Sequence, residues 1–491
     1  MYLNRWLKTH AQLRPNQIAL IDEHGHRTSY AQMYEASKTA AARLQQLGVT
    51  AGDRVATLTA NRPEFLHLLF GCARIGAILV PLNWRLTKAE LAGIVADCDP
   101  KVMFVDAQNT MQAPEHPNAL SIHNFADGVQ ASDYLAEVDE DTAVAIFYTG
   151  GTTGVPKGAV LTHRSIHWNA VNTITGWGLA PTDVAPVFTP MFHTGGLNVL
   201  ATPLFLLGGT VVLAGPFKAE DALDLLVKER CTVLFMVPTM FDMLRSVPEF
   251  DTTDLSRVRL WISGGAPCPR SLFEAYWQRG LPLRQGYGLT EAGPNNFGVN
   301  IEDAKAHLGT VGHPLPFVDI RLVREDGSES AIGEVGELQV RGPHVMSGYW
   351  ARPEATAQAI AYGWLHTGDL AYRNKDGFFF ICGRNKEMFI SGGENVFPAE
   401  IEEVLLDHPA VAEAAVIGVP DAKWGEVGRA YIVAKDAANP PTDAELTAFC
   451  RGRLAGYKVP KQVRIIDSLP KSAAGKILKK LLAEPALAEA R

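Results

Sequence analysis

With 491 residues, the chain is too long for one compact core, so two or more domains are expected. Hydrophobic residues make up 47% and charged residues 20% of it, which is typical of a globular protein and excludes a disordered or fibrous one. The formal net charge is -8 and no block of like charges occurs, which argues against a nucleic-acid-binding protein, whose surface would be basic.

The six cysteines are far apart and form no C-x-x-C pair. This pattern predicts neither a disulfide framework nor a zinc site, and it favours a reducing compartment such as the cytoplasm. The N-terminus lacks the apolar core of a signal peptide. The cysteines are Cys72, Cys98, Cys231, Cys268, Cys382 and Cys450.

Two apolar stretches raise the question of a membrane span. Phe65 to Pro81 is interrupted by His67 and Arg74, which favours a buried helix. Leu197 to Ala214 has no charge, but it contains a proline and a pair of glycines before a β-branched run. A buried helix, a turn and a strand are therefore expected there, and no integral membrane segment is predicted.

From residue 143 to 285 the chain alternates short apolar runs with amphipathic stretches. Such alternation predicts an α/β fold, with a parallel sheet covered by helices. The expected strands are Ala143–Tyr148, Thr232–Val237, Arg259–Ile262 and Leu283–Gln285, and the expected helices begin near Arg164, Ala219 and Arg270.

From about Ala331, glycine becomes frequent and the apolar runs shorten, which predicts a β-rich subdomain. A compact α+β segment follows, and this change in the sequence pattern predicts a domain boundary near residue 385. Its expected elements are a helix over Ala399–Asp407 preceded by Pro398, a strand over Val411–Val419, and helices over Asp443–Leu454 and Gly475–Leu482.

The most specific motif is Tyr148-Thr-Gly-Gly-Thr-Thr-Gly-Val-Pro-Lys-Gly158, directly after an apolar strand. Its glycines let the backbone approach a polyphosphate closely, its amides and hydroxyls can donate hydrogen bonds, and Lys157 adds a positive charge. It is not a Walker motif, because Val155-Pro156 separates Gly154 from the lysine. The alternative interpretation is a plain turn.

This motif resembles the phosphate loop of the adenylate-forming enzymes, which include acyl-CoA synthetases, peptide-synthetase adenylation domains and luciferases. Gly150 stands where that family usually has serine, which removes one hydroxyl. The resemblance covers nearly the whole chain. It implies that ATP contacts Thr149, Gly150, Gly151, Thr152, Thr153, Gly154 and Lys157.

Two further motifs occur in the order that the resemblance implies. Ser263-Gly-Gly-Ala-Pro267 and Gln285-Gly-Tyr-Gly-Leu-Thr-Glu291 would flank the adenine, with the ring of Tyr287 stacked on it. Thr290 would meet the α-phosphate, and Glu291 would bind Mg²⁺, an ion that prefers oxygen ligands. The other ATP-binding positions implied are Gly264, Gly265, Ala266, Gln285, Gly286 and Gly288.

The resemblance implies that Asp369 and Arg384 bind the ribose; a loop cap and a surface ion pair are the alternatives. Lys386 would be the hinge between an N-terminal domain over 1–385, which binds ATP and the acid, and a mobile C-terminal domain over 386–491. The alternative for Lys386 is a solvated lysine. The expected architecture is thus a large α/β domain with a β-rich subdomain, followed by a small α+β domain.

Two C-terminal motifs complete the resemblance. The paired glycines Gly392-Gly393 would let the pantetheine arm of coenzyme A pass close to the backbone during thioester formation. Lys476 matches the family's catalytic lysine, whose ammonium would neutralise charge on the α-phosphate and the attacking carboxylate.

The segment Pro190-Met-Phe-His193-Thr-Gly-Gly196 resembles the one that lines the acyl pocket of acyl- and aryl-CoA ligases. His193 stands where amino-acid-activating relatives carry aspartate, so amino-acid substrates are disfavoured, and it is a candidate catalytic residue; a core histidine is the alternative. The expected pocket also includes Gly195, Gly265, Gly288, Pro294 and Asn295. Asn295 and Asn296 would either bind a polar ring substituent or face water.

The resemblance therefore implies an ATP- and Mg²⁺-dependent ligase that joins a carboxylic acid to coenzyme A through an acyl-adenylate. Medium- or long-chain fatty acids are the expected substrates on base rate, and hydroxycinnamates or other aryl acids are the alternative. Transfer to another acyl acceptor and a non-catalytic nucleotide-binding relative also stay open. A homodimer is left open too. A dinucleotide-dependent oxidoreductase is disfavoured, because no convincing Gly-x-Gly-x-x-Gly opens a helix.

Overall fold

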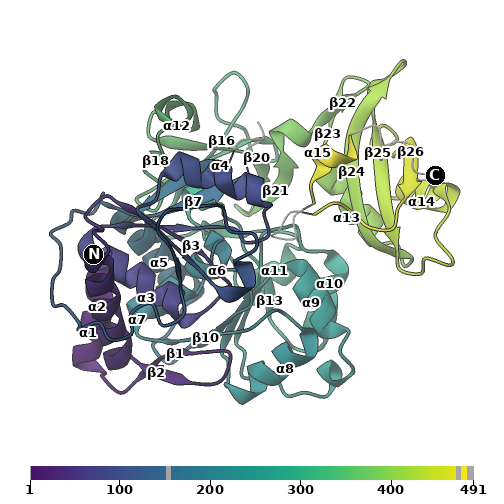
Figure 1. Cartoon of the computed structure of the whole chain (residues 1–491). Coiled ribbons are helices and arrows are strands. Elements are labelled where there is room, and N and C mark those ends of the chain that lie inside the picture. The colour runs from purple at the N-terminus through teal and green to yellow at the C-terminus, as the bar shows by residue number, and fades with distance from the viewer. Residues whose placement is uncertain (1, 151–155, 472–476, 484–491) are drawn as a thin grey trace.

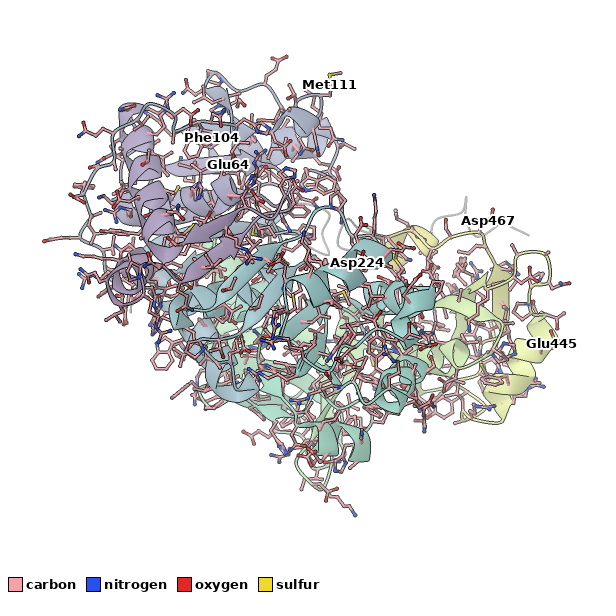
Figure 2. The ribbon with its side chains drawn as sticks, turned by 90° about the horizontal axis from the view of Figure 1, so that it is seen from below. Glu64, Phe104, Met111, Asp224, Glu445 and Asp467 are labelled. Carbon is pink, nitrogen blue, oxygen red and sulfur yellow. The ribbon has the colours of Figure 1, made fainter. Side chains whose placement is uncertain are left out.

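The computed structural model describes residues 2–150, 156–471 and 477–483. Figure 1 shows a large part, built from the N-terminal and central residues, and a smaller part formed by the C-terminal residues. In Figure 2, seen from below, Glu445 and Asp467 lie in the smaller part, on the opposite side of the molecule from Glu64 and Phe104. The α/β class expected from the sequence is confirmed.

A seven-stranded sheet forms one layer of the large part, in the order β18-β8-β7-β4-β3-β5-β6. β7 and β8 are antiparallel and form the hairpin around the glycine-rich loop, whereas the contacts from β7 through β6 are parallel. The strands are β3 (Arg54–Leu58), β4 (Ile78–Pro81), β5 (Val102–Val105), β6 (Ala119–Ser121), β7 (Ala143–Thr149), β8 (Lys157–Thr162) and β18 (Gly348–Tyr349).

Helix α3 shows how the local sequence sets these elements. It begins with Pro63 at its first turn and ends at Gly76, whose positive φ of 74° lets the chain turn directly into β4. The apolar stretch Phe65 to Pro81 contains the predicted buried helix, and it ends in a buried strand that was not predicted. The helices of this region are α1 (Leu3–Leu13), α2 (Tyr30–Gln46), α3 (Pro63–Ile75), α4 (Lys88–Cys98) and α5 (His163–Trp177).

A second sheet has the order β2-β1-β10-β9. The uncharged stretch from Leu197 to Ala214 forms helix and strand around Gly208-Gly209, and this prediction is confirmed. No helix of the described residues is long and apolar enough to cross a membrane. The elements are β1 (Ile18–Ile21), β2 (Arg27–Ser29), β9 (Val184–Val187), β10 (Thr210–Leu213), α6 (Thr194–Asn198) and α7 (Ala201–Leu207).

A third, fully parallel sheet has the order β11-β12-β13 and packs its own apolar core around Trp261 and Tyr276. Its strands alternate with helices as the sequence predicted. The elements are α8 (Ala219–Lys228), β11 (Val233–Met236), α9 (Pro238–Arg245), β12 (Leu260–Ser263), α10 (Arg270–Gln278), β13 (Leu283–Gln285) and α11 (Ile301–Ala306), with short 3₁₀ turns at η1 (Ala107–Asn109), η2 (Pro248–Asp251) and η3 (Thr290–Ala292).

The predicted β-rich subdomain is a five-stranded antiparallel sheet, β16-β17-β20-β19 with β21 beside β20, next to the short β14–β15 pair. Its elements are β14 (Phe297–Gly298), β15 (His313–Pro314), β16 (Asp319–Val323), β17 (Gly336–Arg341), α12 (Pro353–Ala359), β19 (Ile360–Ala361), β20 (Trp364–Arg373) and β21 (Phe379–Arg384).

The smaller part contains a separate sheet, β23-β22-β25-β24 with β26 beside β25. Its last helix is shorter than predicted, because Ile477 pairs with Lys471 as an isolated bridge and the helix begins only at Lys479. Gly475 lies outside the described residues. The elements are η4 (Asn385–Glu387), β22 (Phe389–Ser391), β23 (Glu394–Val396), α13 (Pro398–Leu406), β24 (Val411–Asp421), β25 (Gly425–Ala434), α14 (Asp443–Arg451), β26 (Gln462–Ile465) and α15 (Lys479–Leu482).

None of the cysteines forms a disulfide, and Cys382 alone is not fully buried. Burial raises the pKa of every one of the six thiols above the ordinary value, in the case of Cys450 to about 11. Five of these side chains belong to the protein interior.

Candidate active site

The two ends of the glycine-rich loop are held together by the β7–β8 hairpin. Thr149 and Lys157 are register partners, and the Thr149 hydroxyl lies 3.4 Å from the Lys157 carbonyl oxygen. Gly150 directly follows β7. The remaining predicted loop residues, Gly151, Thr152, Thr153 and Gly154, lie outside the described residues. The structure therefore fixes the base of the predicted phosphate loop.

Glu291 lies beside this base, although it is 142 positions away from Thr149 in the sequence. Thr149 Oγ1 donates a hydrogen bond to Glu291 Oε1 over 3.1 Å, and the Tyr349 hydroxyl donates to the same oxygen, also over 3.1 Å. Thr290 precedes Glu291 in η3 and is partly exposed. The predicted cation-binding carboxylate thus sits next to the predicted phosphate loop.

Tyr349 was not predicted as a site residue. Lys157 Nζ lies over the ring of Tyr349, 5.3 Å from the ring centroid. The chain around it, Ser347-Gly-Tyr-Trp350, has no chemical signature that would mark it from the sequence alone. Only the pairing of β18 with β8 brings it to the site.

Asp369, Arg384 and Tyr287 converge on one another. Asp369 and Arg384 are register partners on β20 and β21, with Arg384 Nε 3.3 Å from Asp369 Oδ1. The Tyr287 hydroxyl donates to Asp369 Oδ2 over 2.5 Å. Burial, and then the neighbouring carboxylate, hold the pKa of the Tyr287 phenol well above its ordinary value. The three predicted nucleoside-binding side chains are therefore neighbours.

The predicted adenine-flanking glycines follow the carboxyl ends of β12 and β13. This is the edge of a parallel sheet where open α/β folds bind their ligands. The Gly286 amide donates to the Ser263 carbonyl oxygen over 2.8 Å, which holds the two turns side by side. Gly265 has a φ of +82°, and it and Ala266 are exposed. Gln285 Oε1 accepts a hydrogen bond from the Cys268 amide at 3.3 Å.

Phe235 of β11 lies next to one predicted acyl-pocket residue, Gly195, and next to one predicted ATP-binding residue, Gly264. A Cβ atom built on Gly195 would lie 3.4 Å from the Phe235 ring, and one built on Gly264 would lie 3.0 Å from it. Glycine at these positions lets an aromatic ring lie directly against the backbone. Gly288 is equally constrained, because a Cβ there would lie 2.2 Å from the Pro294 backbone. Phe235 is partly exposed and was missed as a site residue, since a phenylalanine within a strand indicates only a core position.

His193 immediately precedes helix α6, with its ring centroid 4.5 Å from that of Phe192. Burial lowers the pKa of its imidazole to about 4, so the ring is neutral at physiological pH, and nearby Arg85 acts in the same direction. Its Nε2 is buried and, within the described residues, has no hydrogen-bond partner. That unpartnered nitrogen does not fit the alternative of a satisfied core histidine.

Asn295 and Asn296 are buried, so the alternative that they face water is wrong. Asn295 Nδ2 donates to Thr173 Oγ1 over 2.6 Å and to the Val199 carbonyl oxygen over 3.2 Å. Asn296 bridges the Gly293 carbonyl oxygen and the His344 ring. These amides therefore stabilise the loop after Glu291, which carries Pro294.

In the smaller part, Gly392 and Gly393 form the turn between β22 and β23, with φ values of 63° and 89°. A Cβ on Gly392 would lie 2.9 Å from the ring of Trp424. Lys386 lies in η4, and the next residue, Glu387, accepts an ion pair from Lys479 at 3.1 Å. Lys476 lies outside the described residues.

Comparison with known proteins decides the family. The model described as "AMP-binding enzyme" matches residues 7–350, and that of the "AMP-binding enzyme C-terminal domain" matches residues 400–476. The chain belongs to the AMP-binding enzyme family. It is an AMP-forming acid–CoA ligase, and its cofactors and co-substrate are ATP, Mg²⁺ and coenzyme A.

Individual members of the AMP-binding enzyme family match over nearly their whole length. A feruloyl-CoA synthase from an Amycolatopsis species is 41% identical, with 97% of each chain covered. The long-chain-fatty-acid–CoA ligase FadD13 of Mycobacterium tuberculosis is 36% identical, with 93% of each covered. The structure of the o-succinylbenzoate coenzyme A synthetase of Bacillus subtilis in complex with AMP superposes with a TM-score of 0.90, at 33% identity and 98% coverage of each chain.

The side chains present fit a magnesium ion held together with a nucleotide. Among residues 2–150, 156–471 and 477–483, no cluster of three or more histidine, cysteine or acidic side chains could hold a metal by itself. Glu291 offers one carboxylate beside the hydroxyl of Thr149. Magnesium is commonly bound through one or two carboxylates together with substrate phosphates, so this oxygen-only set suits it.

Proposed function

We propose that this ligase acts on an aryl carboxylic acid, with hydroxycinnamates such as ferulate as the first class to test. The observation that carries the proposal is the partly exposed ring of Phe235, which lies against the backbone at Gly195 and Gly264. An aromatic ring flanked by glycines offers a flat apolar face on which a planar acid can stack. The likeness to a feruloyl-CoA synthase along 97% of the chain supports the same class.

The nucleotide would lie across the carboxyl ends of β12 and β13. We assign the adenine to Tyr287 and the glycines around it, and the ribose to Asp369 with Arg384. The phosphates would contact the loop based on Thr149 and Lys157, with Thr290 on the α-phosphate. Mg²⁺, when bound by Glu291, would neutralise phosphate charge and so favour attack on the α-phosphorus.

In the first half-reaction, the carboxylate of the acid attacks the α-phosphorus of ATP, giving an acyl-adenylate and pyrophosphate. The main obstacle is repulsion between two anions. We propose that Lys157 and Lys476 offset it by placing ammonium groups beside the phosphates. His193 would contribute a neutral imidazole at the acyl end of the site, where its Nε2 can form a hydrogen bond to bound substrate.

In the second half-reaction, the coenzyme A thiol attacks the acyl carbon and releases AMP. We propose a domain division at residues 1–385 and 386–491, with Lys386 as the hinge, and a rotation that brings Gly392 and Gly393 to the acyl group. The turn formed by these glycines suits a narrow passage for the pantetheine arm, because Trp424 packs against one side of it.

Pyrophosphate release tests the function directly. The protein is incubated with Mg-ATP and one acid at a time, from acetate, octanoate and palmitate to benzoate, coumarate and ferulate, with and without coenzyme A. We expect release with the aryl acids, faster with coenzyme A, and formation of the matching thioester. Strong release with octanoate or palmitate and none with any aryl acid would contradict the proposed substrate class.

A fatty acid is the second candidate. FadD13 is named a long-chain-fatty-acid–CoA ligase and matches 93% of the chain. Fatty acyl-CoA ligases are also the larger group among the enzymes that this sequence resembles, which favours the same substrate. The two candidates differ in what the pocket must hold, because a long flexible chain needs a tunnel past Phe235 rather than a flat face. The same panel of acids separates them.

The cellular setting is also a proposal. We infer a cytoplasmic location, because the structure contains six cysteines and none of them forms a disulfide. The partners would be the acid, ATP and coenzyme A. A homodimer remains a prediction, and the elution volume of the full-length protein on a calibrated size-exclusion column tests it.

A further inference from the structure

Three hydrogen bonds donated by backbone amides hold Tyr349 and its neighbours in place. β18 pairs antiparallel with β8, where Tyr349 is the partner of Ala159. The Trp350 amide donates to the Gly158 carbonyl oxygen over 2.7 Å, and the Tyr349 amide donates to Thr356 Oγ1 over 2.8 Å. The Ser347 amide adds a 3.1 Å bond to the Val160 carbonyl oxygen. The position of Tyr349 is therefore fixed relative to the strand that begins at Lys157.

Its side chain contacts two groups to which separate roles are assigned. The hydroxyl donates to Glu291 Oε1 over 3.1 Å, and the ring centroid lies 5.3 Å from Lys157 Nζ. The first contact is a hydrogen bond to a charged acceptor, and the second is a cation–π interaction. One aromatic side chain thus touches both the predicted metal-binding carboxylate and the predicted phosphate-binding ammonium.

The two hydrogen bonds to the Glu291 carboxylate are both accepted by the same oxygen. Thr149 Oγ1 and the Tyr349 hydroxyl both donate to Oε1, each over 3.1 Å. In the part of the chain that the structure describes, Oε2 accepts no side-chain or backbone hydrogen bond. Two donors on one oxygen orient the carboxylate and leave the second oxygen for another ligand.

We propose that Tyr349 is a positioning residue for the metal and phosphate sites. Its hydroxyl orients Glu291 so that Oε2 is presented to the divalent cation, and its ring face holds Lys157 toward the phosphates. The inference rests on the roles assigned to Glu291 and Lys157 in the proposed function. Tyr349 acts through these two side chains. Its removal is therefore expected to weaken metal and nucleotide binding, and to affect the adenylation step only through that weaker binding.

The two contacts are separated by two substitutions. Tyr349→Phe removes the hydroxyl and keeps the ring, and Tyr349→Leu removes both. We expect Tyr349→Phe to raise the dissociation constant of Mn²⁺ from the complex with α,β-methylene-ATP about tenfold, as for the loss of one hydrogen bond to a charged group. The affinity for the metal-free analogue should be unchanged in Tyr349→Phe and about 2- to 5-fold weaker in Tyr349→Leu, because the cation–π contact is lost.

The measurement is a titration of the full-length protein with Mn²⁺, in which free Mn²⁺ is followed by electron paramagnetic resonance with the analogue present and no acid substrate. Tyr276→Phe is the matched control. Its hydroxyl also donates one hydrogen bond, 2.9 Å to the Phe241 carbonyl oxygen, in the core around Trp261. We expect Tyr276→Phe to bind Mn²⁺ as the wild type does, and thermal unfolding confirms that each variant is folded.

Glu291→Gln separates this inference from the proposed function. If Glu291→Gln weakens Mn²⁺ binding while Tyr349→Phe binds it as tightly as Tyr276→Phe does, the positioning role is overturned and the metal role of Glu291 stands. If Glu291→Gln binds Mn²⁺ as the wild type does, the assigned metal role fails and the inference falls with it. Weaker Mn²⁺ binding in both Glu291→Gln and Tyr349→Phe supports the inference.

Discussion

The Tyr287 hydroxyl lies 2.5 Å from Asp369 Oδ2, while Arg384 Nε lies 3.3 Å from the other oxygen of the same carboxylate. Asp369 is thus held from both sides by a phenol and a guanidinium. The raised pKa of Tyr287 keeps the phenol protonated as a donor over the whole physiological range. In the proposed assignment, this arrangement presents one carboxylate to the ribose hydroxyls.

We expect Tyr287→Phe to raise the KM for ATP about tenfold with a smaller effect on kcat, because the ring is kept and only the support of Asp369 is lost. Asp369→Asn should raise KM more. Adding Tyr287→Phe to Asp369→Asn should then have little further effect, since the phenol acts through that carboxylate. Steady-state kinetics of pyrophosphate release measure all three. Additive effects in the double variant would contradict the linkage.

The family-derived role of Lys476 predicts unequal effects on the two half-reactions. Lys476→Ala should lower pyrophosphate release at least a hundredfold, because one preorganised charge on the transferring group is lost. Transfer to coenzyme A from synthetic acyl-AMP should be retained. Lys480→Ala, an exposed lysine on α15, is the matched control. Equal losses in both half-reactions of Lys476→Ala would contradict the assigned role.

Phe235 should determine which acid fits. We expect Phe235→Leu to lower kcat/KM for ferulate relative to octanoate by about tenfold, because the aromatic face is lost while a branched side chain still fills part of the space. Phe104→Leu, at a buried position on β5 in the apolar cluster against which Phe235 also packs, controls for a general loss of packing. The two kcat/KM values are measured for each variant. If the ratio of the two kcat/KM values is unchanged in Phe235→Leu, the acid does not bind against Phe235.

Acid should destabilise the protein through its buried histidines. Burial lowers the pKa of His344 to about 4, against an ordinary value near 6.5. Between these pH values the unfolded chain binds more protons than the folded one, so the free energy of unfolding falls as the pH falls through that window. Above the window, the contribution of His344 to the free energy of unfolding is fully present. His67, His163, His167 and His193 act in the same direction.

The test is the unfolding temperature at pH 7 and pH 5. We expect it to fall by several degrees in the wild type. In His344→Gln the fall should be smaller, because the glutamine amide can still donate to Asn296 Oδ1 but does not titrate. Identical falls in the two proteins would show that His344 does not carry the effect.

The local sequence pattern predicted many elements, since glycine and proline mark their ends, as at Pro398 and Gly208. It also pointed to Thr149, Glu291 and Asp369 as candidates, because each lies in a short motif, and the structure brings Thr149 and Glu291 together. It could not place Tyr349, whose partner Ala159 is far away in the chain and whose pairing depends on the assembled sheet. The alternative that Asn295 faces water could not be excluded from the sequence, because its burial depends on contacts with Thr173 and Val199.

The buried thiols have a consequence for an enzyme that makes acylating agents. An acyl-adenylate reacts with thiolates, and a cysteine of the protein in that form would trap the acyl group as a dead-end thioester. Burial keeps all six thiols protonated at neutral pH. The reactive sulfur at the site is then the one that coenzyme A brings, and the enzyme is protected from its own product chemistry.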